Sequence, residues 1–538
     1  MHSPAVHPGR ALLALCAAAL LTTAGCASPG PVFLGPPLRT ERGVFRVGAG
    51  EVEFTPGKGY PLGGYGGGAR RAEFPFYVGQ GWPGRLALAA HQAWHEEGDD
   101  TLSDMLTPAE GTHDGLTAKA LVIRPAEGQP VAWVRIDAIG VTAEIQDAVA
   151  DRVAALGYPP SGVFVSATHT HAGCGAFMRA PFAALVAMDN FRPEVEEKIV
   201  AACADAIAAA HAAARPARVR FATSRDRDAE GHNVLAQNRR ARRFPGEIAY
   251  DAVDDRIELV QFVDADGGAP LALLANFAVH PTVLGSDNLY FSADLAGGIE
   301  DALEQRLGAP ALFLNGAEGD VSPRRLQTQG GLRRCRELGE AFCDLALPAL
   351  ETAPVHSELA LRAVQGRRIL GRAHTLIALG RERFVSGNRG PQAWVFTPLT
   401  LPLNLVLWTV GFTNLHVELT WNLGFGIVVE LDGLLDRNET RFGGLRLLAG
   451  DEDVCLLTLP GEPTHDLGLE LRRLAEAKGA KRTLVGGLTL DHVGYIASPE
   501  EYRRGGYEAW STLFGEDTGP LLLEGSQAVL DALYDEAP

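Results

Sequence analysis

Positive charge is scarce in this chain of 538 residues. It carries 48 lysines and arginines against 66 aspartates and glutamates, which gives a formal net charge of −18 with neutral histidines. Binding to a phosphate backbone needs a basic surface, so this balance excludes a nucleic-acid partner. Aromatic residues make up only 7%, but 46% of the residues are hydrophobic and 21% are charged. That is the composition of a globular protein and not of a disordered or fibrous one.

Cysteine is scarce as well. The seven cysteines are Cys16, Cys26, Cys174, Cys203, Cys335, Cys343 and Cys455. No two of them stand at CxxC spacing. Cys335 and Cys343 lie in one helix-like stretch, where eight residues correspond to about 12 Å along the axis, too far for a disulfide. The sequence therefore excludes a disulfide scaffold.

The apolar run at the N-terminus is too short to span a bilayer as a helix. Arg10 precedes the apolar stretch 11–21, and small residues lead to Cys26 in LTTAGC. This pattern predicts a signal peptide over residues 1–25, and it resembles a bacterial lipobox, in which the cysteine is lipidated after cleavage. The alternative is a plain signal peptide with a coincidental cysteine. Ala27 is not the aspartate associated with inner-membrane retention. We therefore expect a lipid anchor in the outer membrane of a bacterial cell envelope, facing the periplasm or the exterior.

The rest of the chain indicates a short linker and a long α/β body. Residues 26–42 are rich in proline and glycine, which is typical of a tether, and strand-like and helix-like segments alternate over residues 43–538. Strands are predicted at 44–54 (as a pair), 118–125, 131–140, 162–168, 258–263, 271–279, 311–315, 454–460 and 483–490, with an alanine-rich helix at 193–214. We predict an α/β fold of mixed β-sheets flanked by helices.

Two stretches look inserted into this body. Residues 72–112 are polar and aromatic without clear periodicity, and residues 391–431 are largely apolar. The first apolar run in the second stretch has about 15 residues, fewer than a bilayer requires, and Pro402 and Asn404 interrupt it. This segment is either buried core or an apolar lid that contacts a lipid substrate or a membrane.

Polar clusters directly follow five of the apolar runs. They are THTH with His169 and His171, HPT with His280, GAEGDVSP with Ser322, PGE with Glu462, and DHVGY with Tyr495. Ligands gather at strand ends in α/β folds, so the five clusters are expected to converge on one crevice.

The residue types in these clusters suit a metal. In an extended segment His169 and His171 point to the same face, which presents two imidazoles to one metal, or one to a metal and one to a substrate. A catalytic zinc site takes about three or four N/O ligands and an open position, which His280, Glu462 and a phenolate could complete. Each signal alone has a plain alternative, because a histidine before proline is commonly a structural hydrogen-bonder and Pro-Gly-Glu is commonly only a turn.

Other catalytic motifs are lacking. The chain has no GxSxG elbow, and the glycine-rich GGYGGGA at 63–69 lacks the lysine of a phosphate loop. GAGEVE at 48–53 has a glutamate where a third dinucleotide-motif glycine would stand. His465 and His492 lie close to two of the polar clusters, and we expect them at the surface or in supporting positions.

Five segments stand in a recognisable order. They are SATHTHAGCGA (166–176), NFAVHPT (276–282), EGDVSP (318–323), LPGEPTHDLGLELR (459–472) and GYIASPEEYRRGGYEAWSTLFG (494–515). Together they resemble the neutral, non-lysosomal ceramidase family. VGAGEVEFTP (47–56) and GTHDGLTAKALVI (111–123) are similar to its opening strands, so the resemblance covers about residues 44–516.

The resemblance implies a neutral ceramidase-like catalytic domain over residues 43–538 that hydrolyses amides with zinc. The residues it implies are His169, His280, Glu462 and Tyr495 as zinc ligands, Ser322 as the reactive serine and His171 as general acid or base. Zinc polarises a scissile carbonyl or activates water. Attack by Ser322 and attack by activated water both fit these residues.

Three departures from the family pattern concern the substrate. The family's additional β-sandwich-like C-terminal domain is expected to be absent, because the chain stops soon after STLFG. A further active-site tyrosine is expected between the serine and PGE motifs, but none stands between Tyr290 and Tyr495, so its transition-state hydrogen bond is either absent or supplied by another group such as His416. Arg324, followed by Arg325, replaces the usual asparagine, which favours an anionic amide such as an N-acyl amino acid or an anionic lipid.

The predicted function is zinc-dependent hydrolysis of the amide of ceramide or a related N-acyl lipid to a fatty acid and a free amine. The alternatives are a zinc amidase or esterase for a different, smaller or anionic substrate, and a catalytically silent relative that binds lipid. The expected partners are a lipid or N-acyl amide substrate and a membrane reached through the N-terminal anchor.

Overall fold

A computed structural model describes residues 29–70, 102–324 and 331–535, with gaps at 372, 380–401, 404, 407–415, 422–424, 431–434 and 436–437. Over 374–379, 416–421 and 425–430 only the backbone is described. The predicted signal peptide, Cys26 and most of the stretch 72–112 lie outside the described residues, so the predictions made for them stay predictions.

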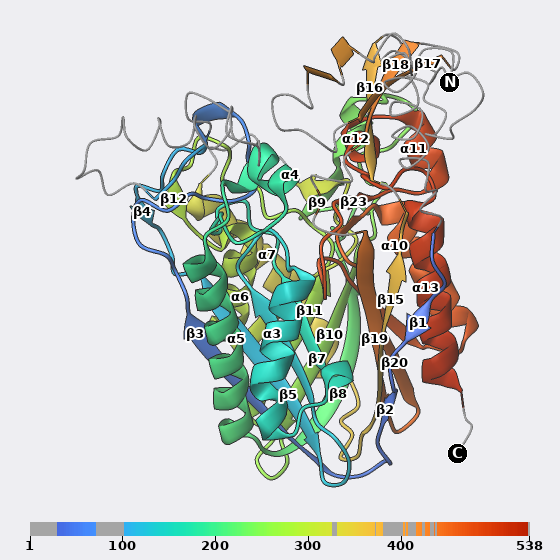
Figure 1. The fold of residues 1–538 in the computed structure, drawn as a ribbon. Coiled ribbons are helices and arrows are strands. Elements are labelled where there is room, and N and C mark those ends of the chain that lie inside the picture. Colours follow the sequence, from blue (N-terminus) through green and yellow to red (C-terminus); the bar gives the residue numbers. More distant parts are fainter. Residues whose placement is uncertain are drawn as a thin grey trace, which may run out of the picture.

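Two mixed β-sheets form the centre of the molecule and lie face to face (Figure 1). The eight-stranded sheet has the order β13 (Ala311–Asn315), β11 (Pro270–Phe277), β10 (Arg256–Asp264), β8 (Arg215–Arg225), β3 (Phe45–Glu53), β5 (Thr117–Pro125), β6 (Val131–Ile136), β7 (Val163–Ala167). The six-stranded sheet has the order β1 (Phe33–Leu34), β15 (Ala360–Ile369), β19 (Glu439–Ala449), β20 (Glu452–Thr458), β22 (Arg482–Gly486), and β2 (Leu38–Arg39) also pairs with β15. Most neighbours are antiparallel, but β6–β7, β11–β13 and β20–β22 are parallel.

Helices cover the outer faces of both sheets. On the eight-stranded sheet lie α3 (Ala143–Val153), α5 (Pro193–Ala213), α6 (Asp294–Leu307) and α7 (Leu332–Ala346), and on the six-stranded sheet lie α10 (His465–Ala477) and α13 (Thr518–Tyr534). Short helices are α4 (Pro181–Ala183), α8 (Pro348–Glu351), α11 (Pro499–Arg504), α12 (Tyr507–Trp510), η1 (Gly68–Arg70), η2 (Ala154–Leu156), η3 (Pro160–Gly162), η4 (Ala184–Met188) and η5 (Arg239–Arg242). The result is a four-layer α/β/β/α sandwich, which confirms the predicted fold class of mixed sheets flanked by helices.

Small sheets lie at the upper end of this sandwich in Figure 1. They are β9 (Ala236–Asn238) with β14 (Val321–Pro323), β21 (Glu462–Pro463) with β23 (Tyr495–Ile496), β4 (Gly111–Thr112) with β12 (Tyr290–Phe291), and β16 (His374–Leu379), β18 (Phe425–Glu430) and β17 (His416–Trp421).

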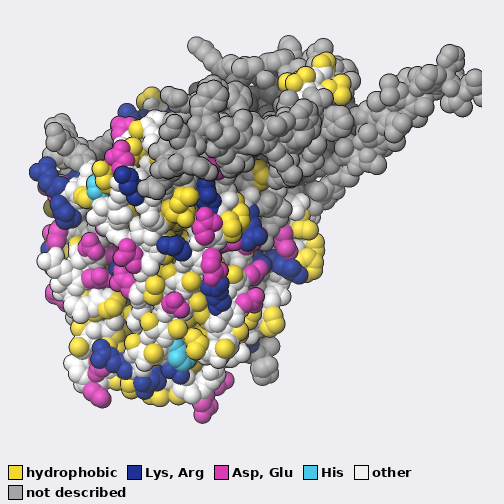
Figure 2. All heavy atoms as spheres, turned by 60° about the vertical axis from the view of Figure 1, so that its left-hand side comes forward, with side chains coloured by type: hydrophobic (Ala, Val, Ile, Leu, Met, Phe, Trp, Pro, Cys, Tyr) yellow, Lys and Arg dark blue, Asp and Glu magenta, His cyan; other side chains and the backbone are white. Residues whose placement is uncertain are grey.

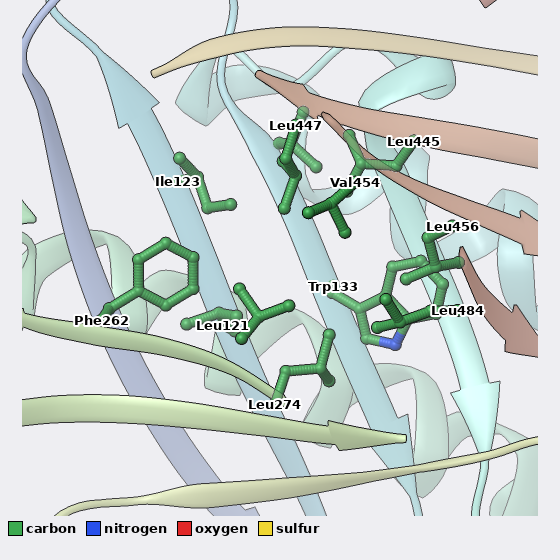
Figure 3. A pocket seen from close by; sticks show the side chains of 12 residues that line it. Leu121, Ile123, Trp133, Phe262, Leu274, Leu445, Leu447, Val454, Leu456 and Leu484 are labelled. Carbon is green, nitrogen blue, oxygen red and sulfur yellow. The ribbon is translucent and has the colours of Figure 1, made fainter. Parts of the chain in front are cut away.

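The space between the two large sheets is filled by aliphatic and aromatic side chains. Leu121 and Ile123 of β5 point into it, together with Trp133 of β6, and meet Leu445 and Leu456 of the other sheet (Figure 3). A cavity of about 20 Å³ remains there, and its lining is apolar. Such a space is only slightly larger than one water molecule needs, and apolar cavities of this kind stay dry. It is therefore a packing gap and not a ligand site.

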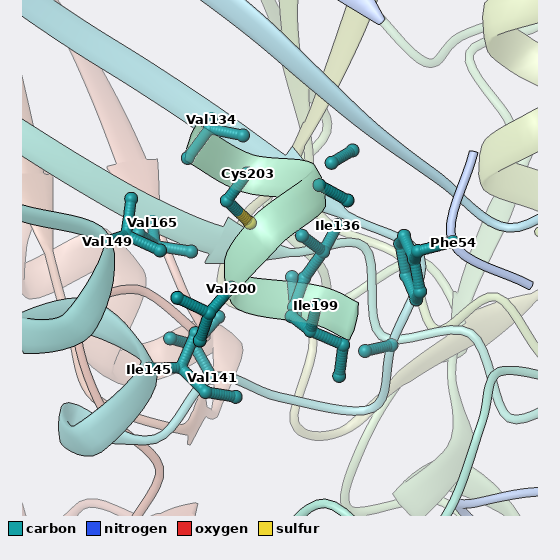
Figure 4. Close-up of a cluster of buried hydrophobic side chains, with 14 of the residues drawn as sticks. Phe54, Val134, Ile136, Val141, Ile145, Val149, Val165, Ile199, Val200 and Cys203 are labelled. Atoms are coloured by element: carbon teal, nitrogen blue, oxygen red, sulfur yellow. The ribbon is translucent and has the colours of Figure 1, made fainter. Parts of the chain in front are cut away.

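The opposite face of β5 and β6 carries a second core. Alternate residues of these strands, such as Val134 and Ile136, point outward to Ile145 of α3 and to Ile199 and Cys203 of α5 (Figure 4). Strands buried on both faces read as continuous apolar runs, which is why the pattern predicted them well. The five described cysteines are buried and unpaired, so the expected lack of disulfides is confirmed for this part of the chain.

The stretch 44–54 holds one strand, β3 (Phe45–Glu53), and the prediction of a strand pair was wrong. Gly48 and Gly50 lie within this strand for a packing reason. Helix α5 crosses β3 so closely that a Cβ at Gly48 would overlap the carbonyl oxygen of Ala210, and one at Gly50 that of Ala206. These glycines permit close contact between a strand and an alanine-rich helix.

Part of the predicted tether packs against the body. β1 and β2 pair with the edge of β15, and Leu38 is buried. The ordered body therefore begins before residue 43. Of the apolar stretch 391–431, the backbone of β17 and β18 is described, and among its few described side chains Leu403 and Leu405 are exposed. Core and lid remain alternatives for the rest of this stretch.

The described surface carries charges of both signs. On the face shown in Figure 2, acidic, basic and apolar side chains are interspersed. Among the helices of the described ranges, none combines the length and apolar character that crossing a membrane requires.

Replacing Gly48 with alanine should destabilise the fold by about 1–3 kcal/mol, because the new methyl group forces β3 and α5 apart. Urea unfolding followed by circular dichroism measures this loss. Gly57 is the control, since a Cβ there meets nothing within 4 Å. An equal effect of both substitutions would show that β3 and α5 are not in close contact.

Candidate active site

The polar clusters that follow five strands come together at one end of the sandwich. Asn315, at the end of β13, donates to Thr168 O in the loop after β7 and to Val279 O in the loop after β11. Leu488 connects two of the following loops, since its N–H donates to Gly461 O and its carbonyl accepts from Ala167 N. The predicted convergence of strand ends is thus present in the fold.

Three buried side chains meet with their lone pairs facing each other. The Nε2 atoms of His169 and His280 are 3.2 Å apart. Glu462 Oε2 lies 3.2 Å from His169 Nε2 and 3.3 Å from His280 Nε2. Tyr495 Oη lies 3.3 Å from His280 Nε2. These are the four residues for which the sequence predicts a metal.

The other ring nitrogens fix the orientation of both imidazoles. His169 Nδ1 is 2.6 Å from Ile139 O, and His280 Nδ1 is 2.7 Å from Glu318 O. A carbonyl can only accept, so each Nδ1 carries the proton and each Nε2 turns an unprotonated lone pair toward Glu462. Histidine ligands of metals commonly have this outer support.

The distances between these atoms fit a bound metal ion. Two atoms that each lie ~2.0–2.1 Å from a tetrahedral zinc are separated by roughly 3.3 Å. Two imidazole lone pairs and a carboxylate at this spacing repel each other unless they share a cation. Glu462 Oε2 has no hydrogen-bond partner among the described residues, which leaves it available as a ligand. The donor set of two nitrogens and two oxygens therefore fits a divalent metal.

Burial shifts the pKa values at this cluster. It lowers the pKa of His280 to about 4, and Arg239 acts in the same direction, so this imidazole is neutral. Burial and the charge of Glu462 raise the pKa of Glu318, whose carboxyl oxygens have no partner in the described structure. Glu318 is thus a buried carboxyl group beside the cluster, and its surroundings favour the protonated form.

Arg239 is a site residue that the sequence pattern did not single out. Its Nη2 donates to Tyr495 Oη at 2.8 Å and to Gly319 O at 2.6 Å, and its Nε donates to Glu508 at 2.8 Å. Burial raises the pKa of Tyr495 well above its usual range, and the Arg239 cation opposes that shift. Arg239 belongs to a run of arginines at 239–243 without a motif of its own, so only the fold could reveal it.

A turn, and not the predicted extended segment, brings the two histidines of THTH close together. Strand β7 ends at Ala167, and His169 has a left-handed backbone with φ of 70°. The alternation of an extended strand does not apply here. The turn brings His171 Nε2 within 3.4 Å of His169 Nε2, with the rings perpendicular. Backbone bonds such as His169 N to Ala138 O hold the turn.

Ser322 lies at the end of the tight turn that follows β13. Gly319 N donates to Pro463 O, and a Cβ on Gly319 would press against the backbone of Glu462 and Pro463. Glycine at this position lets the serine turn approach the PGE segment. Ser322 then pairs with Gln237 in the β14–β9 ladder and is half-buried.

Asn315 ties three loops together at the end of β13. Its Nδ2 donates to Thr168 O and Val279 O, both at 3.0 Å. Its Oδ1 accepts from the backbone N–H of Val279 and of Gly316. One buried amide therefore connects the THTH loop, the HPT loop and the serine turn.

Two cavities meet at this centre. A polar cavity of about 860 Å³ is lined by His171, His280, Ser322, Tyr495 and several arginines. An apolar cavity of about 520 Å³ borders the centre from another side. Its apolar lining includes Ile139, Met178, Phe182, Val186, Leu435, Val493, Leu513 and Phe514. The residues that border both cavities are Gly64, Tyr65, His171, Tyr495 and Tyr507.

Two tyrosines stand near the centre although the expected motif position lacks one. The Tyr65 ring lies 4.6 Å from the His171 ring, and the Tyr507 ring lies 5.2 Å from the Tyr495 ring. Both tyrosines border the two cavities. Phenol groups therefore lie near the centre, although the sequence has no tyrosine between the serine and PGE motifs. The side chain of His416 is outside the described part, and its suggested role stays a prediction.

The two further histidines occupy supporting positions. His465 is largely buried, and its Nδ1 lies 2.7 Å from Asp320 Oδ2 in the serine turn. His492 Nε2 lies 3.7 Å from Glu462 Oε1. Neither is among the groups in closest contact at the cluster, as expected.

Known proteins resemble this chain in sequence and fold. Residues 102–391 match the family described as "Neutral/alkaline non-lysosomal ceramidase, N-terminal". A neutral ceramidase of Pseudomonas aeruginosa is 23% identical over 526 residues, which cover 83% of this chain and 70% of that protein. Neutral ceramidase 2 of Arabidopsis thaliana is 29% identical over 232 residues, 41% of this chain but only 29% of the length of that relative.

The fold agrees with this match. The crystal structure of the neutral ceramidase from Pseudomonas aeruginosa superposes with a TM-score of 0.63 at 21% identity, covering 92% of this chain and 76% of that one. The family match spans more than half of the residues of the chain. The matched residues include the THTH, HPT and serine turns, which form one centre. The chain therefore belongs to the neutral/alkaline non-lysosomal ceramidase family.

Proposed function

We propose that this chain is a zinc-dependent amidohydrolase that cleaves ceramide or a related N-acyl lipid to a fatty acid and a free amine. The observation that carries the proposal is the lone-pair cluster of His169, His280 and Glu462, with Tyr495 beside it, at the junction of a polar and an apolar cavity. Family membership supports the same chemistry.

The residues around the cluster have distinct tasks in this reaction. When bound, zinc supplies a Lewis acid that polarises the scissile carbonyl. Ser322 presents its hydroxyl on the wall of the polar cavity that His171 also lines. His171 accepts the proton of the attacking hydroxyl or water and returns it to the leaving amine. Arg239 stabilises negative charge on Tyr495 through its hydrogen bond to Oη.

The apolar cavity accounts for a lipid substrate. Its volume of about 520 Å³ and its lining of aliphatic and aromatic side chains suit an acyl chain. Transfer of each methylene from water into such a site is worth about 0.8 kcal/mol. The acyl chain therefore contributes binding energy and places its carbonyl at the cluster.

A buried ion pair holds the serine turn. Burial acts to lower the pKa of His465, but the Asp320 carboxylate outweighs it and raises that pKa to about 9. Burial acts in the opposite sense on Asp320, and His465 brings its pKa to about 2. Asp320 also accepts from His465 N at 2.8 Å and from Asn238 at 3.0 Å. The pair joins α10 to the turn that carries Ser322.

Chelation should abolish fatty-acid release from ceramide, and added zinc should restore it. In a panel of ceramides, N-acyl amino acids and simple esters, we expect Ser322→Ala and His171→Ala to lose turnover by about 10²–10⁴-fold while the metal content stays unchanged. His280→Ala should lose the metal, as measured by elemental analysis after dialysis.

Ser161→Ala and His232→Ala are the matched controls, since neither residue lines the cavities, and both should behave like the wild-type chain. Full activity of both the Ser322 and His171 variants would refute the assigned site. Metal-dependent release of fatty acid only from substrates other than ceramide would support the proposed hydrolysis but refute ceramide as the substrate.

Val186→Asp should lower kcat/KM for long-chain amides about ten-fold, because it places a carboxylate in the acyl cavity, while short-chain amides lose much less. Steady-state kinetics over a series of acyl lengths checks this. Leu156→Asp is the control, an exposed leucine away from both cavities. An equal loss of kcat/KM at every chain length would show that the acyl chain does not bind in this cavity.

Stability should fall as the pH rises from about 6.5 to 9. His465 loses its proton near pH 6.5 when unfolded but only near 9 when folded, so its contribution is complete below the first value and lost above the second. Between these pH values the wild-type chain should lose more free energy of unfolding than the double variant His465→Gln, Asp320→Asn. The difference should be on the order of 2 kcal/mol. Urea unfolding at pH 6.5 and 9.5 measures both, and identical pH dependences would contradict the ion pair.

A further inference from the structure

The polar cavity beside the centre has a strongly basic wall. The arginines that line it are Arg239, Arg240, Arg242, Arg243, Arg324 and Arg334. Among its lining residues within the described ranges, Glu508 is the only acid. The whole chain is acidic, so this concentration of positive charge is local and is not a consequence of composition.

Two of these arginines are already neutralised by protein carboxylates. Arg239 donates to Glu508, and Arg240 donates to Glu501 and lies 3.7 Å from Glu508. Their charges stabilise Tyr495 and the local fold. They leave little positive potential for a ligand.

Arg334 is different, because it is buried and its charge is poorly satisfied. It is only 9% exposed, and its Nη1 makes one long bond of 3.4 Å to Glu337. Its Nη2 is buried and has no hydrogen-bond partner among the residues that the structure describes. A buried cationic donor without a partner is costly, and such groups normally face an anion.

Arg324 adds a second incompletely satisfied guanidinium to the same wall. It follows Pro323 directly after the serine turn, and its Nη1 is buried without a hydrogen bond in the described structure. The nearest carboxylate oxygen, of Asp251, lies 3.9 Å away. Guanidinium groups match carboxylate and phosphate oxygens with paired N–H donors.

We infer that this cavity binds an anionic group on the amine half of the substrate, a carboxylate or a phosphate, with Arg334 and Arg324 as its receptors. The inference rests on the proposed amide hydrolysis and deepens it. The acyl chain occupies the apolar cavity, the amide lies at the cluster, and the anion lies in the polar cavity. The substrate class is an N-acyl amine with a negative charge, such as an N-acyl amino acid or a phosphorylated N-acyl lipid.

A membrane surface is a poorer source of the anion than the substrate itself. Arg334 lines the cavity and is only 9% exposed, so a flat membrane surface has little access to its guanidinium. A cavity of about 860 Å³ that also borders Ser322 and His171 receives part of a reacting molecule.

The test compares matched substrates in neutral detergent micelles, where no anionic surface is present. One pair is N-dodecanoylglycine and its uncharged glycinamide, and the other is a ceramide phosphate and the same ceramide. We expect the full wild-type chain to prefer the anionic member of at least one pair in kcat/KM. Arg334→Gln should reduce that preference roughly ten-fold, since a charge-assisted hydrogen bond is lost. Which pair responds tells carboxylate from phosphate.

Arg333→Gln is the matched control. Arg333 precedes Arg334 on α7 and lies 3.5 Å from the same Glu337, but its side chain is 67% exposed and does not line the cavity. This variant should keep the wild-type preference. A wild-type chain that hydrolyses the neutral members equally well or better, or an equal loss in both arginine variants, overturns the anion site and leaves the amidohydrolase proposal intact.

A second measurement keeps the two proposals separate. Equilibrium dialysis of radiolabelled N-dodecanoylglycine and its glycinamide, and of the ceramide phosphate and ceramide in the same micelles, against the Ser322→Ala chain reports binding without turnover. Tighter binding of an anion than of its neutral partner, lost on adding Arg334→Gln but not Arg333→Gln, supports the anion site even if no substrate is hydrolysed. Equal binding within both pairs overturns it.

Discussion

The imidazoles of His169 and His280 and the carboxylate of Glu462 face one another across 3.2–3.3 Å, and this arrangement of donors fits a shared metal cation. The carbonyls of Ile139 and Glu318 hold both Nδ1 protons and thereby remove the option of a hydrogen bond between the two rings. A metal bound here would relieve the repulsion between these groups and would thereby stabilise the loops that carry them.

The architecture delivers these groups from distant parts of the sequence. Hydrogen bonds join the loops that follow strands of two separate sheets, so residues from His169 to Tyr495 meet at one end of the sandwich. Glu462 and Tyr495 are direct partners in the β21–β23 ladder, which brings these two residues side by side. The hydrophobic cores lie between the layers of the sandwich, whereas these groups lie on loops at its end. The loops are therefore free to serve chemistry.

Much of the fold followed from the pattern of the chain, since strands buried on both faces appear as continuous apolar runs. β11 and β13 and helix α5 lie close to where the sequence placed them. The strand pair at 44–54 failed because glycine signals both turns and close packing, and a single sequence does not separate the two. The pairing of β7 with β6 and the order of the sheets were beyond reach, because they depend on contacts between distant segments.

The candidate site divides in the same way. The motif-bearing residues lie together as the resemblance implied, but the left-handed turn at His169 was not foreseen, because it depends on the backbone of Ala138. Arg239 and Arg334 carry no motif. The sequence shows only that an arginine carries a positive charge. Its role depends on whether the fold places a carboxylate within hydrogen-bond distance of it. Arg239 finds Glu508, while Arg334 does not find a full set of partners.

Asn315 gives the centre a property that no single loop has. Its amide joins the loop of His169, the loop of His280 and the turn of Ser322 through four hydrogen bonds. Displacement of one loop is therefore transmitted to the others, and the effects of substitutions in different loops will not add. For the evolution of new specificity this means that the loops of His169 and His280 and the turn of Ser322 change together. The parts of the cavity walls that do not belong to these loops, such as Phe182 and Val186, are the parts that can vary one residue at a time.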